Sequence, residues 1–112
     1  MSIAGDLIRG HTDAIILARL LRGDSYGYEI NKTISTISSG RFELKEATLY
    51  TAFKRLEEAG FIASYWGNSG AGARRRYYII TAAGRDAYHR LMLEWLETKE
   101  IMDNLLRMED VL

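Results

Sequence analysis

Apolar residues recur at spacings of four and three between Glu46 and Gly60, a pattern that predicts an amphipathic helix. Leu49, Phe53 and Leu56 share one face of this helix. The other face carries hydroxyls and cations, contributed by Thr48, Tyr50, Thr51, Lys54 and Arg55. Gly60 is expected to end the helix, because glycine is common at helix C-termini. A core can hold such a helix by its apolar face while the polar face offers hydrogen-bond donors to an external partner.

Two strands are predicted after this helix, over residues 61–67 and 74–81, with residues 68–73 as a glycine-rich hairpin tip. Arg74, Arg75 and Arg76 follow the tip, and no acidic residue occurs between Tyr65 and Ile80. Three adjacent positive charges repel one another and are best explained by an anionic partner. Because neighbours in a strand alternate between its faces, Arg75 should point away from Arg74 and Arg76. At most two of the three can therefore face the same partner.

Two helices are predicted in the first part of the chain. Residues 6–22 are apolar over a wide arc, so this helix is expected to pack inside the domain and also against a second chain. A second helix is expected over residues 26–37, with Ser25 as its N-cap. In the following link, Phe42 and Leu44 alternate with charged residues. This link either pairs as a short strand or fixes the loop to the core.

A long helix is predicted at the end of the chain. Thr81 is its expected N-cap, and the helix runs to about Met108, a length of roughly 40 Å at 1.5 Å per residue. That is more than a domain of this size needs internally. A heptad-like seam is formed by Tyr88, Leu91, Trp95, Thr98, Met102, Leu105 and Leu112. Such a seam favours pairing with the same helix of a second subunit, and the alternative is a helix folded back on its own domain.

The distribution of charge is more informative than the net charge of zero. Residues 82–112 contain four basic and seven acidic residues, whereas residues 1–81 contain 11 basic and eight acidic residues. The segment with the arginine-rich hairpin is therefore the basic one. A three-charge imbalance is common in proteins, so it supports an anionic partner only together with the helix and the hairpin.

Several functional classes receive no support. There is no cysteine, no apolar run approaches the ~20 residues of a membrane span, and no secretion signal is expected, so the sequence predicts a cytoplasmic protein without a membrane partner. His11 and His89 are isolated, so no metal site is expected. The glycine-rich tip lacks the Lys-Ser/Thr of a phosphate-binding loop, and no serine or threonine has a recognisable base partner. We therefore expect neither an enzyme nor a cofactor.

The order of elements predicts a mainly α fold with a small β-hairpin, namely a winged helix-turn-helix domain over residues 1–81 and a dimerisation helix over residues 82–112. In that arrangement the helix over residues 46–60 enters the major groove of double-stranded DNA, and the hairpin, or wing, follows the backbone. Two alternatives remain for this surface. Lys54 and Arg55 pair with Glu57 and Glu58 on a solvated helix, with Tyr50 in the core, or the winged helix binds an acidic protein.

Several short motifs, in this order, resemble the PadR family of bacterial transcriptional regulators. They are Tyr26-Gly-Tyr-Glu29, Ala47-Thr-Leu-Tyr50, Lys54-Arg-Leu-Glu57, Gly60-Phe-Ile62 and Arg74-Arg-Arg-Tyr-Tyr78, followed by Thr81 and Gly84. The resemblance covers about Asp6 to Leu105 and is closest to the small subfamily with a single short C-terminal helix. It implies a homodimeric repressor, joined through its first and last helices, that binds a pseudo-palindromic operator. Tyr26, in the first motif, joins the candidate DNA contacts.

The resemblance also implies a ligand site. Some members of the small subfamily bind flat aromatic compounds between the subunits, stacked on a tryptophan of the last helix. Trp95 occupies the matching position here, and its expected neighbours are Leu7, Ala14 and Met92. Lys99 stands where an acid might complement a cationic drug, which favours a neutral or anionic compound, or none. The alternative is that Trp95 packs in an interface without a ligand.

Overall fold

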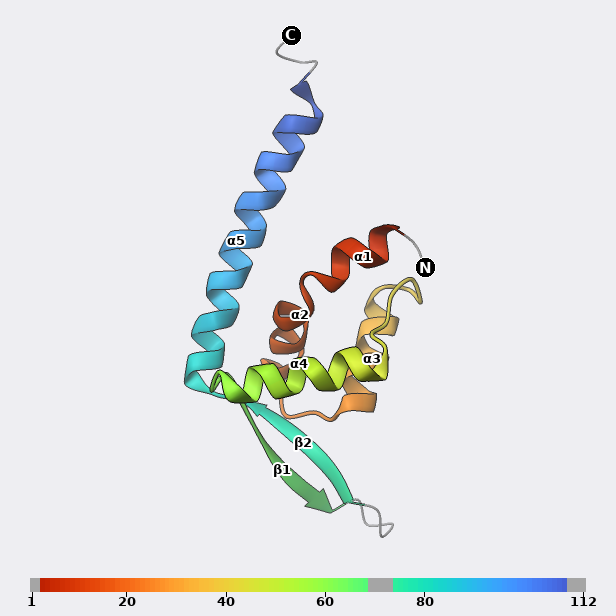
Figure 1. Ribbon diagram of the computed structural model, residues 1–112, viewed down its shortest axis with the longest axis vertical. Helices are drawn as coiled ribbons and strands as arrows, with labels where there is room; N and C mark the ends of the chain where they lie inside the picture. The colour runs from red at the N-terminus through yellow and green to blue at the C-terminus, as the bar shows by residue number, and fades with distance from the viewer. Residues whose placement is uncertain (1–2, 69–73, 109–112) are drawn as a thin grey trace.

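The computed structural model describes residues 3–68 and 74–108. Its elements are α1 (Ile3–Arg9), α2 (Thr12–Leu20), α3 (Gly27–Ile37), α4 (Glu46–Glu58), β1 (Ile62–Asn68), β2 (Arg74–Ile80) and α5 (Ala82–Leu106) (Figure 1). The two strands form an antiparallel hairpin that projects from the helices beneath α4, while α5 extends as a long arm on the other side (Figure 1). The predicted fold class, mainly α with a β-hairpin and a long last helix, is confirmed.

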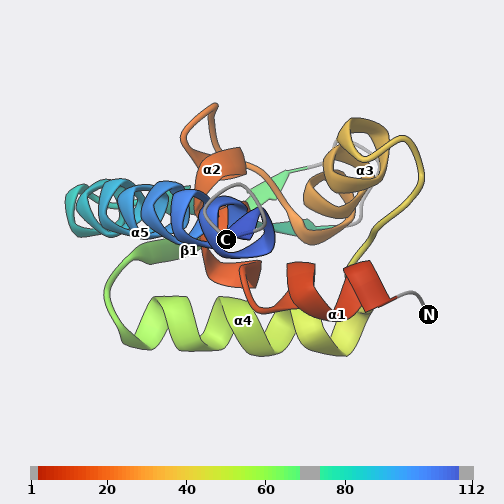
Figure 2. The same cartoon turned by 90° about the horizontal axis from the view of Figure 1, so that it is seen from above.

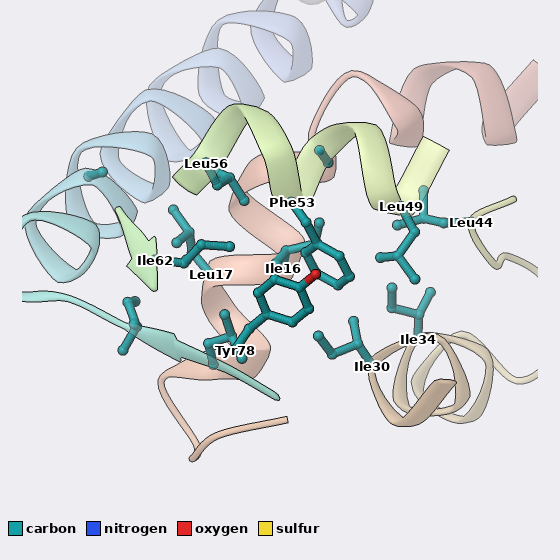
Figure 3. Packing of buried hydrophobic residues seen from close by; sticks show 14 of the residues in the cluster. Ile16, Leu17, Ile30, Ile34, Leu44, Leu49, Phe53, Leu56, Ile62 and Tyr78 are labelled. Atoms are coloured by element: carbon teal, nitrogen blue, oxygen red, sulfur yellow. The ribbon is translucent and has the colours of Figure 1, made fainter. Parts of the chain in front are cut away.

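The core lies where α2, α4 and the base of the hairpin meet (Figure 3). Ile16 and Leu17 of α2 are completely buried, and the ring of Phe53 from α4 stacks on that of Tyr78 from β2 with centroids 3.9 Å apart. The three residues that define the apolar face of α4 in the sequence are all buried. This packing fixes which side of α4 faces outward.

The expectation of one helix over residues 6–22 is wrong. The helix is interrupted by a turn at Gly10 and His11, so that α1 ends at Arg9 and α2 begins at Thr12. The Thr12 hydroxyl donates to the Arg9 carbonyl at 2.7 Å, and the His11 N–H donates to the Ile8 carbonyl at 2.8 Å. Glycine is a poor helix former, and these short-range bonds satisfy the end of α1 instead. The break separates an α2 with buried Ile16 and Leu17 from an α1 on which Leu7 is exposed.

The loop before α3 makes a pairing that was not predicted. The backbone of Ser25 forms an isolated antiparallel bridge with Tyr78 of β2, with N–H to O distances of 3.2 and 2.7 Å. Tyr26, rather than Ser25, is the N-cap of α3, and the Ser25 hydroxyl donates to the Glu29 carboxylate at 2.7 Å. The hairpin is therefore tied to the segment that precedes α3.

The link between α3 and α4 takes the second of its two predicted forms. It does not pair as a strand, and Phe42 and Leu44 are buried. The side-chain amide of Asn31 brackets the Leu44 backbone, donating to its carbonyl at 2.6 Å and accepting from its N–H at 2.8 Å. The loop is thus fixed to the core by two apolar side chains and one amide.

The start of α5 confirms the predicted cap, because the Thr81 hydroxyl accepts from the Gly84 N–H at 3.0 Å. The first half of α5 packs on its own domain, through Ala87, Tyr88 and Leu91 beside α2. From Leu96 onward the described part of the helix is exposed and leaves the body of the molecule (Figure 1). The last seam position, Leu112, lies outside the described residues. Within the described ranges, no helix is both long and apolar enough to cross a membrane.

Candidate nucleic-acid interface

Helix α4 lies along an outer edge of the molecule (Figure 2). Thr51 and Lys54 are exposed and Thr48 is half-buried. Tyr50 has features of both of its predicted roles, as a DNA contact and as a core residue. Its ring packs edge-on against Phe53 at 5.5 Å between centroids, yet 47% of the residue is exposed. Its hydroxyl lies so close to Gly27, the first residue of α3, that a Cβ there would be 2.9 Å from it.

The three wing arginines divide as predicted between the two faces of the hairpin. The guanidinium groups of Arg74 and Arg76 lie over the ring of Trp66, at 5.3 and 5.8 Å from its centroid. Arg75 instead lies 4.6 Å over the ring of Tyr26. The stacking on Trp66 holds two cations side by side on one face, and the predicted alternation is confirmed.

The face with Arg74 and Arg76 is the one directed toward α4. The Glu57 carboxylate accepts a hydrogen bond from the Ser64 hydroxyl at 2.9 Å and lies 3.6 Å from a guanidinium nitrogen of Arg76. Because Glu57 belongs to α4 and its two partners belong to the two strands, this carboxylate fixes the angle between helix and wing. The flank of α4 that carries Glu57 is thereby joined to the face of the wing that carries Arg76.

The opposite face of the wing carries aromatic rings and is anchored to the loop before α3. Tyr26 meets Tyr77 edge-on at 5.4 Å, and Tyr77 stacks on Tyr65 at 5.6 Å. The Tyr65 hydroxyl donates to Asp24 at 2.6 Å, and this bond raises the pKa of the phenol. The structure thus places Tyr26 and Arg75 on a different face from Arg74 and Arg76. On this geometry Tyr26 supports the wing.

Arg55 is not a simple outward cation of α4. Its guanidinium donates two hydrogen bonds to the Asp13 carboxylate of α2, one of them from Nε at 3.2 Å and the other a shorter bond from Nη2. These bonds raise the pKa of Arg55. The alternative drawn from the sequence paired Arg55 with Glu57 or Glu58. The structure pairs it instead with Asp13, 42 residues away.

Two residues of this surface were missed by the sequence reasoning, namely Trp66 and Glu57 in their roles as platform and anchor. The signal for Trp66 was available. Once the tip is set at residues 68–73, Trp66 falls opposite Arg76 in the hairpin register. The role of Glu57 depends on the angle between α4 and the wing, which no local pattern contains.

The residues expected at the ligand site come together only in part. Trp95 is 42% exposed and meets His11 edge-on at 5.2 Å. An apolar hollow of about 300 Å³ beside it includes Ala14 and Met92, and a more polar one of about 340 Å³ includes Ala14, Asp13 and Arg55. Leu7 and Lys99 line neither hollow. Among the described residues no group of three histidines or carboxylates is arranged to hold a metal ion.

Comparison with known proteins agrees with this geometry. Residues 16–90 match the family described as transcriptional regulator PadR-like. An uncharacterized protein of Lysinibacillus sphaericus is 46% identical over 101 residues, covering 90% of this chain and 93% of that one. A transcriptional regulator from Clostridium thermocellum is 46% identical, with a TM-score of 0.84 over 92% of this chain and 97% of its own. A PadR family transcription regulator from Clostridium difficile is 38% identical, with a TM-score of 0.74 over 86% and 98%.

The family match spans well over half of the chain, and the relatives are covered almost completely. The matched segment runs from the core of α2 through α3, α4 and the wing into the first turns of α5, so it contains the whole candidate interface. The chain therefore belongs to the PadR-like family of transcriptional regulators.

Proposed function

We propose that this regulator is a homodimeric repressor that binds double-stranded DNA at a pseudo-palindromic operator. The observation that supports the proposal is the attachment of the Arg74–Arg76 face of the wing to α4 through Glu57. In the proposed complex Thr48, Thr51 and Lys54 face the major groove and its phosphate edges. Arg74 and Arg76 contact backbone phosphates, with Tyr50 at the margin of the surface.

Dimerisation is supported by the exposed apolar surface of α5. Leu93, Leu96, Ile101, Met102, Leu105 and Leu106 are all between 46% and 72% exposed. Large exposed apolar surface on a soluble protein commonly marks a protein–protein interface. Residues 82–112 are therefore proposed as the dimerisation segment, attached to a DNA-binding unit of residues 1–81. A two-fold axis along α5 gives half-sites about 34 Å apart, one turn of the double helix.

Titrating salt tests the DNA-binding proposal against its rival, an acidic protein partner. We expect the logarithm of the affinity for a duplex to fall linearly with the logarithm of salt concentration, with a slope near −0.9 per phosphate neutralised. Fluorescence anisotropy of a labelled duplex between about 50 and 200 mM salt measures that slope. Absence of binding to any duplex at low salt would favour the acidic-protein alternative.

We further propose that a planar aromatic compound, neutral or anionic, acts as inducer between the subunits beside Trp95. Two copies of this half-exposed indole near the two-fold axis offer faces for stacking, worth ~0.5–1.5 kcal/mol each beyond burial. Such a compound shifts the spacing of the two α4 helices only through its different affinity for the two arrangements. Ala14 and Met92 adjoin the same hollow, and Lys99, with Leu7, is proposed to be brought to it by the partner.

Tryptophan fluorescence tests this site. Titration of the protein with neutral or anionic planar aromatics is expected to quench emission with saturation at one compound per dimer. Trp66 also emits, so the control is Trp95→Phe, in which the saturable quenching should disappear. Quenching that persists in that variant would place the compound elsewhere, and quenching by none of the compounds would favour a packed interface without ligand.

A further inference from the structure

Arg55 stands between two hollows of the structure that belong to the two proposed activities. One hollow contains Trp95, His11 and Asp13, and the other contains Thr48 and Thr51 of the proposed DNA face. The Arg55 side chain lines both. It lies one helical turn after Thr51 on the same flank of α4, and about half of the side chain is exposed. A rotation of this long side chain about its own bonds is enough to change which hollow its charge occupies.

In the described conformation Asp13 holds the guanidinium on the Trp95 side. The carboxylate belongs to the first turn of α2, immediately before Ala14, and accepts two hydrogen bonds from Arg55. The Asp13–Arg55 pair has no net charge, so Arg55 adds little to the attraction of phosphate while this ion pair is formed. Ion pairs this exposed contribute little to stability, so a phosphate placed on the other side competes with Asp13 on nearly equal terms.

We propose that Asp13 binds the Arg55 guanidinium in the DNA-free protein, and that the guanidinium exchanges Asp13 for a backbone phosphate when DNA docks on α4. Asp13 is then a positioning residue, acting on DNA only through Arg55. This inference rests on the proposed DNA-binding function and adds a specific link to it. The exchange leaves the Asp13 carboxylate without Arg55 in a hollow that Trp95, Glu94 and Arg9 also line, so occupation of that hollow and binding of DNA influence each other through this pair.

Two single substitutions and the double variant test the exchange. In each, the charged residue is replaced by a neutral one of similar shape. Asp13→Asn removes the competitor and is expected to tighten duplex binding about two- to five-fold, the range of an exposed ion pair. Arg55→Gln removes one phosphate contact, so affinity should fall about ten-fold and the salt slope should become shallower by about 0.9. In the double variant, Asp13→Asn should no longer have an effect, because the group that it releases is absent.

A purely structural ion pair gives a different result. Both single variants would then lower the melting temperature, neither would change the salt slope, and Asp13→Asn would weaken binding or leave it unchanged. That pattern would overturn the exchange. Failure of the wild-type protein to bind any duplex would instead overturn the proposed function, so the two failures are distinguishable.

The link to the Trp95 hollow has its own readout. In a Trp66→Phe background, in which Trp95 is the remaining tryptophan, addition of duplex at low salt is expected to change the emission of Trp95. Asp13→Asn in that background should abolish or strongly reduce the change, because no charge is then left behind. A response that Asp13→Asn leaves unaltered would show that the two hollows are not joined through this pair. So would the lack of any response from the Trp66→Phe protein at duplex concentrations where anisotropy shows that it is bound.

Discussion

Simultaneous replacement of Arg74 and Arg76 by alanine is expected to weaken binding to every duplex alike, by about 100-fold near physiological salt. The two guanidinium groups lie together over Trp66, on the face of the wing directed toward α4. A hydrogen bond to a charged group contributes roughly 1.5–3 kcal/mol, and 1.4 kcal/mol corresponds to a factor of ten in affinity, so two phosphate contacts give this magnitude. The loss of two neutralised phosphates should also make the salt slope shallower by about 1.8.

The control is Arg75→Ala, which removes one arginine from the opposite face of the wing. Arg75 is held over Tyr26, so its loss should reduce affinity less than the loss of either neighbour. Anisotropy titrations with an operator duplex and with a scrambled duplex measure both quantities, and circular dichroism checks that the wing remains folded. A double variant that changes only the preferred operator, with overall affinity retained, would mean that the wing reads bases, contrary to the assignment to backbone contact.

The parts of the fold that could be predicted are those set by local rules. The period of apolar residues gave the inward face of α4, the alternation of a strand separated Arg75 from its neighbours, and a single threonine marked the start of α5. Each depends on residues within one or two turns or within one strand. The family resemblance rested on motifs of the same short range, and its expected fold is the observed one.

The parts that could not be predicted depend on partners far apart in the chain. Arg55 bonds to Asp13 of α2 and not to the acids beside it on the same helix. Ser25 pairs with a strand that begins some 50 residues later. A continuous apolar arc over residues 6–22 concealed a break at Gly10, since apolar residues continue on both sides of it. Those arrangements follow from how the elements pack, so they required the structure.

Replacement of Gly84 by alanine is expected to destabilise the protein by about 3 kcal/mol, the upper range for forcing atoms into a packed site. A Cβ built at Gly84 would lie 2.0 Å from the carbonyl oxygen of Phe61 and 2.8 Å from Cγ1 of Ile80. The Phe61 oxygen is backbone and also accepts from the Thr81 N–H at 3.0 Å, so it cannot simply turn aside. Alanine favours helices over glycine by about 1 kcal/mol, which is too little to offset such a clash.

Gly10→Ala is the matched control, because a Cβ at that position meets its nearest neighbour, the Leu7 carbonyl oxygen, at an ordinary 3.4 Å. Thermal denaturation at one fixed protein concentration measures the difference, since the apparent stability of an oligomer depends on concentration. We expect Gly84→Ala to lower the melting temperature by more than about 10 °C and Gly10→Ala to change it little. The Gly84 clash lies where α5 leaves the base of the wing, so a variant that folds by tilting α5 would also displace the proposed dimerisation surface of that helix. Equal unfolding midpoints for the two variants, with dimerisation intact, would show that this junction yields easily and does not set the direction of α5.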